Sequence, residues 1–362
     1  MAGKIYNVGV VGYGLSAKVF HIPFITTTHP FKLHSIVQRS PKEGDSAPHD
    51  HPDVKHYTDV KDLIADPDVD VVVVTTPPNL HFDLTKAALE AGKHVLTEKP
   101  FVPSSAEAEA LMAVAREHNR LICVYQNRRW DSDFLLVKHL LAAGTLGRVV
   151  EFNTHFDRHR PQAPATWKGQ LDMSAGGTAL FDLGTHLIDQ AYVLFGMPAS
   201  VHGRLLNQRE GRVELASPDS VSAELMYADG MLVNVKIGIL SVEAEQPRFW
   251  VRGTKGSFRK TGLDSQEGQL RAGAKPTDAG FGEESTEGMA LTVIDAEGRF
   301  VSAPVPQLVP ETYRAFYAGF GRAVETGEEE HVPVKAGEAR DVLKIIEAIV
   351  ESAKTGRNVS LE

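Results

Sequence analysis

The chain is short of the residues and segments on which several classes of protein depend. Its 362 residues include a single cysteine, Cys123, which excludes an internal disulfide and a metal site built from several thiolates. No apolar run approaches the ~20 residues that a membrane span needs, although 42% of the residues are hydrophobic. The amino terminus, Met-Ala-Gly-Lys, leads at once into a strand-like segment without a cleavable apolar core, so we expect a cytoplasmic protein.

An excess of positive charge is also missing. The formal net charge is −9 and no basic stripe is present, so nucleic acid is not an expected partner. We see no internal repeat and no low-complexity tail. The length predicts roughly two domains of ordinary soluble composition.

A glycine-rich turn follows the first apolar run. Residues Tyr6 to Val11 read as a strand, and Gly12-Tyr-Gly-Leu-Ser-Ala17 comes directly after them. This is the Gly-x-Gly-x-x-Gly/Ala pattern, placed between a strand and a plausible helix. Gly12 permits the tight turn, Gly14 lets the backbone approach a pyrophosphate, and Ala17 allows close packing of helix on strand. The motif predicts a dinucleotide site.

Strands and helices then alternate as far as Tyr125. Apolar runs predict strands at 33–37, 69–76, 94–97 and 121–125, and the segments between them predict helices at 79–91 and 104–118. The run at 69–76 is almost entirely β-branched, as expected of a parallel strand covered on both faces. It ends in Pro77-Pro78-Asn79, a loop where an open parallel sheet would hold its ligand. We therefore predict a doubly wound Rossmann domain over residues 1–125.

The end of the second strand indicates which dinucleotide is bound. An NAD enzyme usually carries Asp or Glu there to hold the ribose 2′-hydroxyl. This chain has Gln38, Arg39 and Ser40 instead, which suit a 2′-phosphate through an ion pair and hydrogen bonds. NADP (NADPH) is therefore favoured over NAD, with a solvated loop arginine as the alternative for Arg39.

Glu98-Lys99-Pro100 follows the predicted strand at 94–97. The proline prevents the strand from continuing into a helix. A lysine at the end of a buried strand, beside a nicotinamide ring, could exchange a proton with a substrate hydroxyl. The alternative is a surface lysine before a turn.

From Asn127 the pattern changes to that of an antiparallel sheet with flanking helices. Turn residues predict hairpins at 226–233, 249–258 and 291–300, and helices are expected at 133–143, 311–325 and 336–352. The polar, glycine-rich stretch 262–287 is expected to be a long loop. We predict an α+β substrate-binding and oligomerisation domain over 126–362, whose uncovered sheet face makes a homodimer contact.

One segment of this second domain carries an acid and an imidazole four residues apart. In Gly176-Gly-Thr-Ala-Leu-Phe-Asp182-Leu-Gly-Thr-His186, a helix would place Asp182 and His186 on one face, with Asp189 near the same stripe. Asp182 could then orient His186, which could act as acid or base near neutral pH. A surface pair or a packed histidine is the alternative. No supporting ligand set accompanies these residues, His49/His51 or His155/His159, so no metal is expected.

Five segments together resemble the Gfo/Idh/MocA family, the glucose–fructose oxidoreductase and inositol dehydrogenase relatives. They occur in family order and span about half the chain: Gly12–Ala17, Thr75-Thr-Pro-Pro-Asn-Leu-His81, Glu98–Pro100, Asn127-Arg-Arg-Trp-Asp131 and Gly176–His186. Tyr13-Gly-Leu-Ser16 followed by Val19-Phe-His-x-Pro23-Phe24 is most similar to the NADP-dependent subgroup, which includes scyllo-inositol dehydrogenases. Ala17 stands where many members have glycine.

The resemblance implies a role for each matched residue. Lys99 would be the catalytic lysine, with Asp182 and His186 holding the substrate and moving its proton. Further substrate contacts are implied for Trp130, Asp131 and, by a loose match, Tyr313; core packing is the alternative for Trp130 and Trp167. The implied cofactor-binding set is Gly12, Gly14, Leu15, Ser16, Gln38, Arg39, Ser40, Thr75, Pro77, Asn79, His81, Glu98, Lys99, Asn127, Arg128, Trp167 and Lys168.

We therefore expect an NADP-dependent oxidoreductase that transfers a hydride between nicotinamide and a polyol, sugar or related hydroxy-carbonyl compound. Neither nucleic acid nor a membrane is an expected partner. The main alternative is a non-catalytic, dinucleotide-sensing regulatory protein of the same fold. A periplasmic transhydrogenase is disfavoured because no export signal precedes Lys4.

Overall fold

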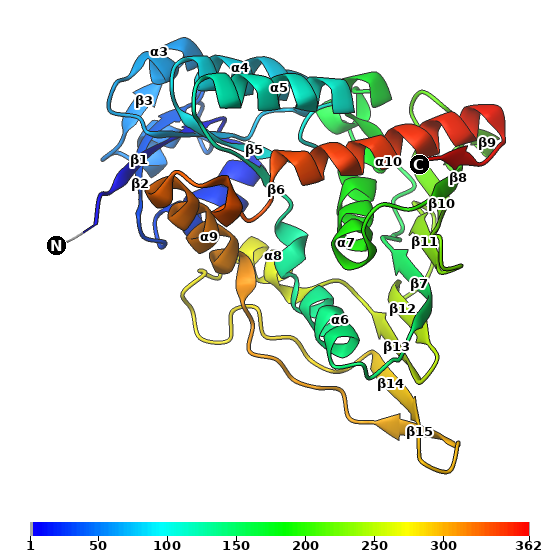
Figure 1. Cartoon of the computed structure of the whole chain (residues 1–362). Coiled ribbons are helices and arrows are strands. Elements are labelled where there is room, and N and C mark those ends of the chain that lie inside the picture. The colour runs from blue at the N-terminus through cyan, green and yellow to red at the C-terminus, as the bar shows by residue number, and fades with distance from the viewer. Residues whose placement is uncertain (1–2, 362) are drawn as a thin grey trace. The chain divides into compact units, whose positions relative to one another are not determined.

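A computed structural model of the chain describes residues 3–361, which divide into two compact units (Figure 1). The first unit comprises residues 3–130, 266–281 and 311–340, and the second comprises 131–265, 282–310 and 341–361. Neither unit is one stretch of sequence, because the chain returns to the first unit twice after leaving it. The division into domains 1–125 and 126–362 stays a prediction.

The first unit contains a six-stranded parallel sheet in the order β3-β2-β1-β4-β5-β6. Its strands are β1 (Tyr6–Val11), β2 (Phe31–Val37), β3 (Lys55–Tyr57), β4 (Val71–Val74), β5 (His94–Glu98) and β6 (Ile122–Tyr125). The order reverses between β1 and β4, which makes this the switch point where doubly wound sheets bind ligands. All four valines of β4 are buried, as its β-branched run predicts.

Helices connect these strands, as expected of a doubly wound fold. They are η1 (Ala17–His21), α1 (Ile22–Ile25), α2 (Ala47–Asp50), α3 (Val60–Ala65), η2 (Pro78–Leu80), α4 (His81–Glu90), α5 (Ser105–Glu117) and η3 (Asn127–Trp130). The predicted capping box opens α5, where the Ser104 side chain accepts a hydrogen bond from the Glu107 amide (3.2 Å). Figure 1 shows α4 and α5 side by side, and the two helices are in contact.

Later parts of the chain complete this unit. They contribute most of α8 (Ser265–Arg271), α9 (Thr312–Thr326), η7 (Glu329–His331) and the start of α10 (Ala336–Thr355). The Val124 amide of β6 donates to the Val334 carbonyl (3.2 Å), so the edge of the parallel sheet is covered. The expectation that 262–287 is only a loop is wrong, because it contains α8. The sequence at the start of α8, Asp264-x-x-Glu267, has the pattern of a helix cap. The glycines on either side of it favour a loop and made the helix hard to predict.

The second unit contains a mostly antiparallel sheet in the order β15-β14-β13-β12-β7-β11-β10-β8-β16, with β9 paired to β8. The strands are β7 (Val149–His155), β8 (Ser200–Asn207), β9 (Arg212–Val213), β10 (Ser220–Met226), β11 (Leu232–Ile237), β12 (Pro247–Gly253), β13 (Gly256–Thr261), β14 (Met289–Ile294), β15 (Phe300–Ala303) and β16 (Val359–Ser360). The three predicted hairpins are confirmed as β10–β11, β12–β13 and β14–β15. Only β7 and β11 pair in parallel among the strands of this sheet in residues 131–361.

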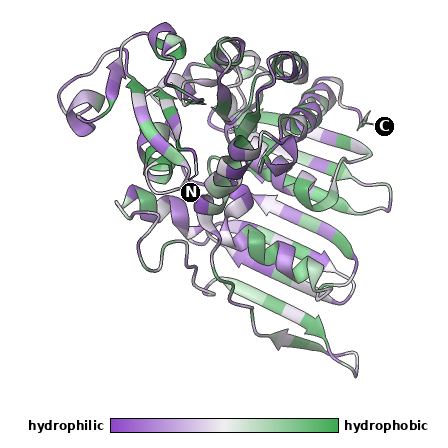
Figure 2. Cartoon of the chain, turned by 60° about the vertical axis from the view of Figure 1, so that its left-hand side comes forward, coloured by the Kyte–Doolittle hydropathy of each residue, from purple (hydrophilic) through white to green (hydrophobic). Residues whose placement is uncertain are grey.

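One face of this second sheet is covered by helices. The unit's helices are α6 (Ser132–Ala142), η4 (Trp167–Gly169), η5 (Met173–Ala175), η6 (Leu180–Gly184), α7 (Thr185–Phe195) and most of α10. Gly203 of β8 is needed for close packing, since a Cβ there would lie 2.6 Å from the Ile349 carbonyl oxygen of α10. Along β10 and β11 apolar residues alternate with polar ones, and the hydropathy colouring of Figure 2 changes along the strands accordingly.

Among residues 3–361, no helix has both the length and the apolar character that crossing a bilayer requires.

The packing of α5 can be tested with Leu111→Ala. Leu111 is completely buried, so its truncation should lower the free energy of unfolding by about 2–5 kcal/mol. Leu80→Ala is the matched control, because Leu80 is 42% exposed and should cost less than about 0.5 kcal/mol. Urea unfolding followed by circular dichroism measures both. Equal, small losses would contradict the burial of this helix face.

Candidate functional site

The glycine-rich turn lies at the carboxyl end of β1, where the motif predicts it. Gly12 has φ of +105°, and a Cβ there would lie 2.7 Å from the Thr75 hydroxyl oxygen, so only glycine fits. Thr75 in turn donates to the Val11 carbonyl (2.9 Å), which joins the ends of β1 and β4. A Cβ at Gly14 would meet no described atom within 4 Å. The turn is therefore open at Gly14, and the residues present fit a bound pyrophosphate.

The predicted helix after this turn is confirmed but begins in an unexpected form. Ala17–His21 is a π-helical turn, η1, and the α-helical turn α1 follows at Ile22. The side chain of Lys18 from this turn pairs with Asp45 (2.6 Å), and the Tyr13 hydroxyl donates to Asp50 (2.7 Å). Both contacts attach the segment after β2 to the glycine-rich turn.

Three of the residues predicted to bind the cofactor follow β2 and differ in exposure: Gln38, Arg39 and Ser40. The Gln38 side chain donates to the Asp45 carbonyl (2.8 Å) and accepts from the Ala47 amide (2.7 Å). Arg39 and Ser40 are exposed. Gln38 therefore holds the following segment in place, and contacts of all three residues with a cofactor stay a prediction.

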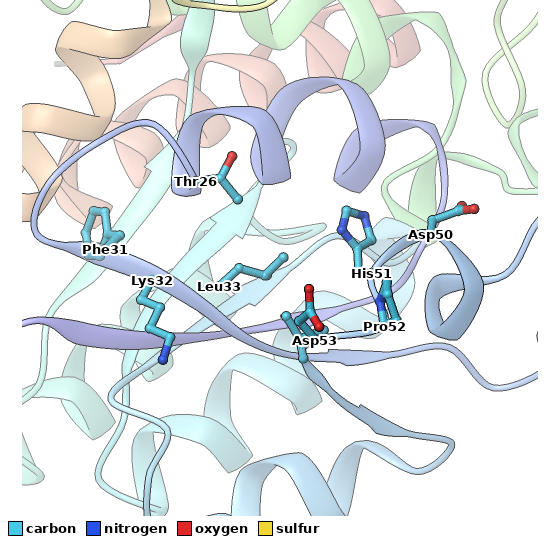
Figure 3. A pocket seen from close by; sticks show the side chains of 9 residues that line it. Thr26, Phe31, Lys32, Leu33, Asp50, His51, Pro52 and Asp53 are labelled. Carbon is cyan, nitrogen blue, oxygen red and sulfur yellow. The ribbon is translucent and has the colours of Figure 1, made fainter.

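A shallow cavity of about 360 Å³ lies beside the same segment (Figure 3). Its lining comes from the end of α1, the start of β2, the end of α2 and the stretch that follows it: Thr26, Phe31, Lys32, Leu33, Asp50, His51, Pro52, Asp53 and Val54. None of the predicted site residues is among them. Two of these residues link the cavity to Tyr13 of the glycine-rich turn: Asp50 accepts a hydrogen bond from the Tyr13 hydroxyl, and the His51 ring lies edge-on to that of Tyr13, with 5.7 Å between the ring centroids.

The Glu98 side chain is hydrogen-bonded to the glycine-rich turn. Its carboxylate accepts hydrogen bonds from the Ser16 hydroxyl, from Nε2 of His21 (3.0 Å) and from the Lys99 amide (3.0 Å). Burial would raise the pKa of Glu98, but the hydrogen bonds and charge of His21, together with Lys99 and Ser16, outweigh it and lower the pKa to about 2. Glu98 is therefore an ionised carboxylate that joins the turn to Lys99.

His81 holds the main chain on the other side of Lys99. Its Nδ1 lies 2.8 Å from the Pro100 carbonyl oxygen and its Nε2 lies 2.9 Å from that of Thr76. Burial lowers the pKa of His81, and the hydrogen bonds to the Thr76 and Pro100 carbonyls oppose that shift. Pro77 precedes η2 and Asn79 lies exposed within it, next to these bonds. Contacts of Pro77, Asn79 and His81 with a cofactor stay predictions.

The turn η3 brings together several of the predicted residues after β6. Arg128 pairs with Glu267 of α8 (2.6 Å), and Arg129 pairs with Glu338 of α10 (2.8 Å). Trp130 packs edge-on against Phe316 of α9, with 5.3 Å between the ring centroids. Asn127, at the start of the turn, is buried.

Gln266 of α8 was not identified from the sequence, yet it joins two predicted residues. Its side chain donates to the Trp130 carbonyl (2.9 Å) and accepts from the Tyr313 amide (2.9 Å). Tyr313 is fully buried at the start of α9. Because the polar, glycine-rich pattern of 262–287 predicts a loop, it indicates no role for Gln266.

In the second unit, Asp182 and His186 lie on adjoining helical segments. Asp182 is in the π-helical turn η6, and His186 is buried in the first turn of α7. The ammonium of Lys168 donates to both carboxylate oxygens of Asp182 (2.9 and 3.1 Å) and lies 5.6 Å from the ring centroid of Trp167. The structure thus places Lys168, predicted on the cofactor side, in an ion pair with Asp182, predicted on the substrate side.

A strained turn precedes η6. Thr178 has φ of +77°, which a β-branched residue rarely adopts, and a Cβ at Gly177 would lie 2.3 Å from the Leu171 carbonyl oxygen. Within residues 3–361 the buried hydroxyl of Thr178 has no hydrogen-bond partner. Strain of this kind persists only where the surroundings enforce it, and it often accompanies function.

Arg248 fastens α7 to the sheet from within the core. Its guanidinium is completely buried and donates to Gln190 of α7 (2.7 Å), the Thr154 hydroxyl (3.2 Å), the His155 carbonyl (3.3 Å) and Asp133 of α6 (3.3 Å). Gln190 lies one turn after His186 on the same helix face. The position of His186 therefore depends on this buried cation.

Asp131, predicted on the substrate side, is the buried residue that precedes α6. Near it, Lys260 lies 2.6 Å from Glu284 and 3.6 Å from Asp133. Burial raises the pKa of Glu284 to about 7, helped by the charges of Asp133 and Asp131 and opposed by Lys260.

Two groups of acids and histidines in residues 3–361 could geometrically hold a metal: His34, Asp66 and Asp68, and Glu328, Glu330 and His331. In the first, the Lys55 ammonium already lies 3.1 Å from Asp66, where a cation would have to displace it. The second is exposed except for His331. That no metal is bound stays a prediction.

Two known protein families match most of the chain. Residues 6–126 match the family described as "Oxidoreductase family, NAD-binding Rossmann fold", and residues 138–361 match "Oxidoreductase family, C-terminal alpha/beta domain". The chain belongs to the Gfo/Idh/MocA family. It is an oxidoreductase with a Rossmann domain for a nicotinamide cofactor, and the predicted fold class is confirmed.

Similar proteins match over nearly the whole chain. scyllo-Inositol 2-dehydrogenase (NADP(+)) IolW of Bacillus subtilis is 36% identical over 98% of this chain and 96% of its own length. The oxidoreductase YdgJ of Escherichia coli is 40% identical over 96% of each chain. The solved structure of yvaA from Bacillus subtilis, an oxidoreductase, has a TM-score of 0.89 at 34% identity, covering 99% of this chain and 100% of that one.

The half-buried acid Glu284 makes the stability of the fold depend on pH. Its pKa in the folded chain lies above the ordinary value of 4.5, so between pH 4.5 and about 7 the folded state holds a proton that the unfolded state releases. This contribution to stability is complete below pH 4.5 and is lost as the pH rises through about 7. Between pH 5 and 8, the Tm of the wild type should therefore fall more steeply than that of Glu284→Gln.

Differential scanning calorimetry measures both slopes. Glu287→Gln, an exposed acid three residues away, is the control and should keep the wild-type slope. Parallel slopes for wild type and Glu284→Gln would contradict the raised pKa.

Proposed function

We propose that this chain is an NADP-dependent oxidoreductase acting on the CH–OH group of a polyol, a sugar or a related hydroxy-carbonyl compound. The observation that carries the proposal is the Glu98 carboxylate, which joins the glycine-rich turn to Lys99 through hydrogen bonds on both sides. The name of the similar Bacillus subtilis protein, a scyllo-inositol 2-dehydrogenase that uses NADP(+), supports both the substrate class and the cofactor.

Lys99, His186 and Asp182 are the proposed catalytic residues. When bound, the nicotinamide supplies the acceptor or donor of the hydride. Lys99 stands at the carboxyl end of β5, half-buried, and can exchange a proton with the reacting oxygen. His186 shares this proton transfer or holds a substrate hydroxyl, and Asp182 orients the substrate while Lys168 pairs with it. Trp130, Asp131 and Tyr313 are proposed substrate-side residues.

The cofactor is proposed to bind along the carboxyl edge of the first sheet. Gly12, Gly14, Leu15 and Ser16 would contact the pyrophosphate, since the turn is open there. Arg39 and Ser40 would hold the 2′-phosphate, because both are exposed and no Asp or Glu occupies positions 38–40. The remaining contacts are proposed for Thr75, Pro77, Asn79, His81, Glu98, Asn127, Arg128, Trp167 and Lys168.

We also propose a homodimer formed through the face of the second sheet opposite its helices. Trp250, Asn153, Asn234 and Glu224 follow one another across β12, β7, β11 and β10 on that face. The Asn234 side chain donates to that of Asn153 (3.1 Å), and Trp250 is 43% exposed beside them. A flat face of amide groups and an exposed indole suits a contact between two copies.

The role of Lys99 is tested by NADPH oxidation over a panel of carbonyl compounds. Lys99→Met keeps the length of the side chain and removes its proton, so kcat should fall about 10²–10⁴-fold while NADPH affinity changes little. Lys86→Met, an exposed lysine of α4, is the control and should behave as wild type. Unchanged activity of Lys99→Met would rule out its proposed role. NADPH binding by the wild type without turnover of any compound would favour the dinucleotide-sensing alternative.

The preference for NADP is tested with Arg39→Ala. Loss of a charge-assisted contact with the 2′-phosphate should weaken NADPH binding about tenfold or more and leave NADH binding nearly unchanged. Arg116→Ala, at an exposed position of α5, provides the control. Fluorescence titration with each dinucleotide measures the affinities, and equal losses for both would defeat the assignment.

A further inference from the structure

Three side chains from different parts of the first unit form a buried hydrogen-bonded chain. Tyr317 comes from α9, His21 from the end of η1 and Glu98 from the end of β5. The Tyr317 hydroxyl lies 2.6 Å from Nδ1 of His21, and Nε2 of His21 lies 3.0 Å from Oε1 of Glu98. His21 is completely inaccessible and Tyr317 is 1% exposed. The proposed catalytic, substrate-binding and cofactor-binding residues include neither His21 nor Tyr317.

The hydrogen bonds of this chain end on an acceptor. Glu98 is ionised and can only accept, so Nε2 of His21 carries a proton and donates it to the carboxylate. The other ring nitrogen, Nδ1, is bonded to the Tyr317 hydroxyl. Burial raises the pKa of Tyr317, which keeps that hydroxyl protonated. The chain therefore runs from Tyr317 through His21 to Glu98.

The surroundings of this chain are mainly aromatic. The His21 ring lies 4.3 Å from that of Tyr125, and Phe24 stacks on Tyr317 with 5.7 Å between the ring centroids. A carboxylate beside such rings loses its hydration and stays ionised only if donors replace the water. The titratable groups around Glu98 and Tyr317, from the elements packed against them, are His21, Lys99, His81, Tyr125 and Cys123.

Both oxygens of the Glu98 carboxylate already accept hydrogen bonds. Oε1 accepts from the Ser16 hydroxyl as well as from His21, and Oε2 accepts from the Lys99 amide. Any rotation of Glu98 would therefore move the glycine-rich turn and the main chain of Lys99 together. A protonated Glu98 could not accept all of these bonds and would release one of the two sides.

We propose that His21 and Tyr317 are positioning residues that act through Glu98, so that one buried carboxylate sets both the seating of the cofactor on the Ser16 turn and the position of Lys99. The inference rests on the proposed function, because it needs a dinucleotide on that turn and a reactive Lys99. Positioning would give these three hydrogen-bonded side chains a purpose besides stability. Buried ionic groups can often be replaced by apolar side chains of similar size with little loss of stability.

The test is a double-mutant cycle read out by NADPH affinity and kcat. Tyr317→Phe removes the hydroxyl that holds Nδ1 of His21, so the imidazole is less firmly directed at Glu98. NADPH binding should weaken and kcat should fall, each about tenfold. His21→Leu should lose more than His21→Gln, which retains an N–H donor. In the Glu98→Gln background, adding Tyr317→Phe should change neither quantity further.

Phe24→Leu is the matched control for stability. It removes a ring from the same aromatic cluster and leaves the hydrogen bonds of Tyr317, His21 and Glu98 in place, so its Tm should fall while NADPH affinity and kcat stay near wild type. The inference would be overturned if Tyr317→Phe changed only the Tm. It would also be overturned if the effects of Tyr317→Phe on NADPH affinity and kcat added fully to those of Glu98→Gln. Both outcomes presuppose a wild type that binds and oxidises NADPH. A wild type without dinucleotide binding would instead overturn the proposed function, and the inference with it.

Discussion

A carboxylate kept ionised away from water is the constraint on which the first unit depends. Glu98 is 8% exposed, and its charge is stabilised by donors from η1, from the glycine-rich turn and from its own neighbour Lys99. Each donor is worth little by itself, but leaving such a charge unpaired would cost several kcal/mol. The carboxyl ends of β1 and β5 are therefore tied together at the switch point of the sheet, where doubly wound folds bind their ligands.

In the second unit, the buried charged group that holds several elements together is a cation. Arg248 is completely buried and holds α6, β7 and α7 together, with Asp133 as its counter-ion. Arg248 donates a hydrogen bond to the Gln190 side chain, and His186 lies one helical turn before Gln190. In both units, the residues proposed for chemistry are thus placed on rigid elements by hydrogen bonds from buried groups.

The sequence predicted the features that depend on local rules. β1 was found with its observed bounds because an apolar run ends at Gly12, where only glycine fits beside Thr75. The hairpins of the second sheet were found because turn residues interrupt alternating strands. Helix α8 was missed because glycines and polar residues surround its short apolar face. The π turns η1 and η6 were missed because a hydrogen bond shifted by one residue leaves no mark in hydrophobic periodicity.

The sequence alone determined the fold class, the family and the types of residue available for chemistry, since patterning and short motifs follow from bonds between near neighbours. Tertiary structure decided which side chains are paired by hydrogen bonds and ion pairs. It showed Gln38 holding the 45–47 segment, Lys168 paired with Asp182, and Tyr317 bonded to His21 almost 300 residues away. Such contacts depend on how distant elements pack, because a side chain's hydrogen-bond partner is chosen by distance and burial in space and not by spacing along the chain.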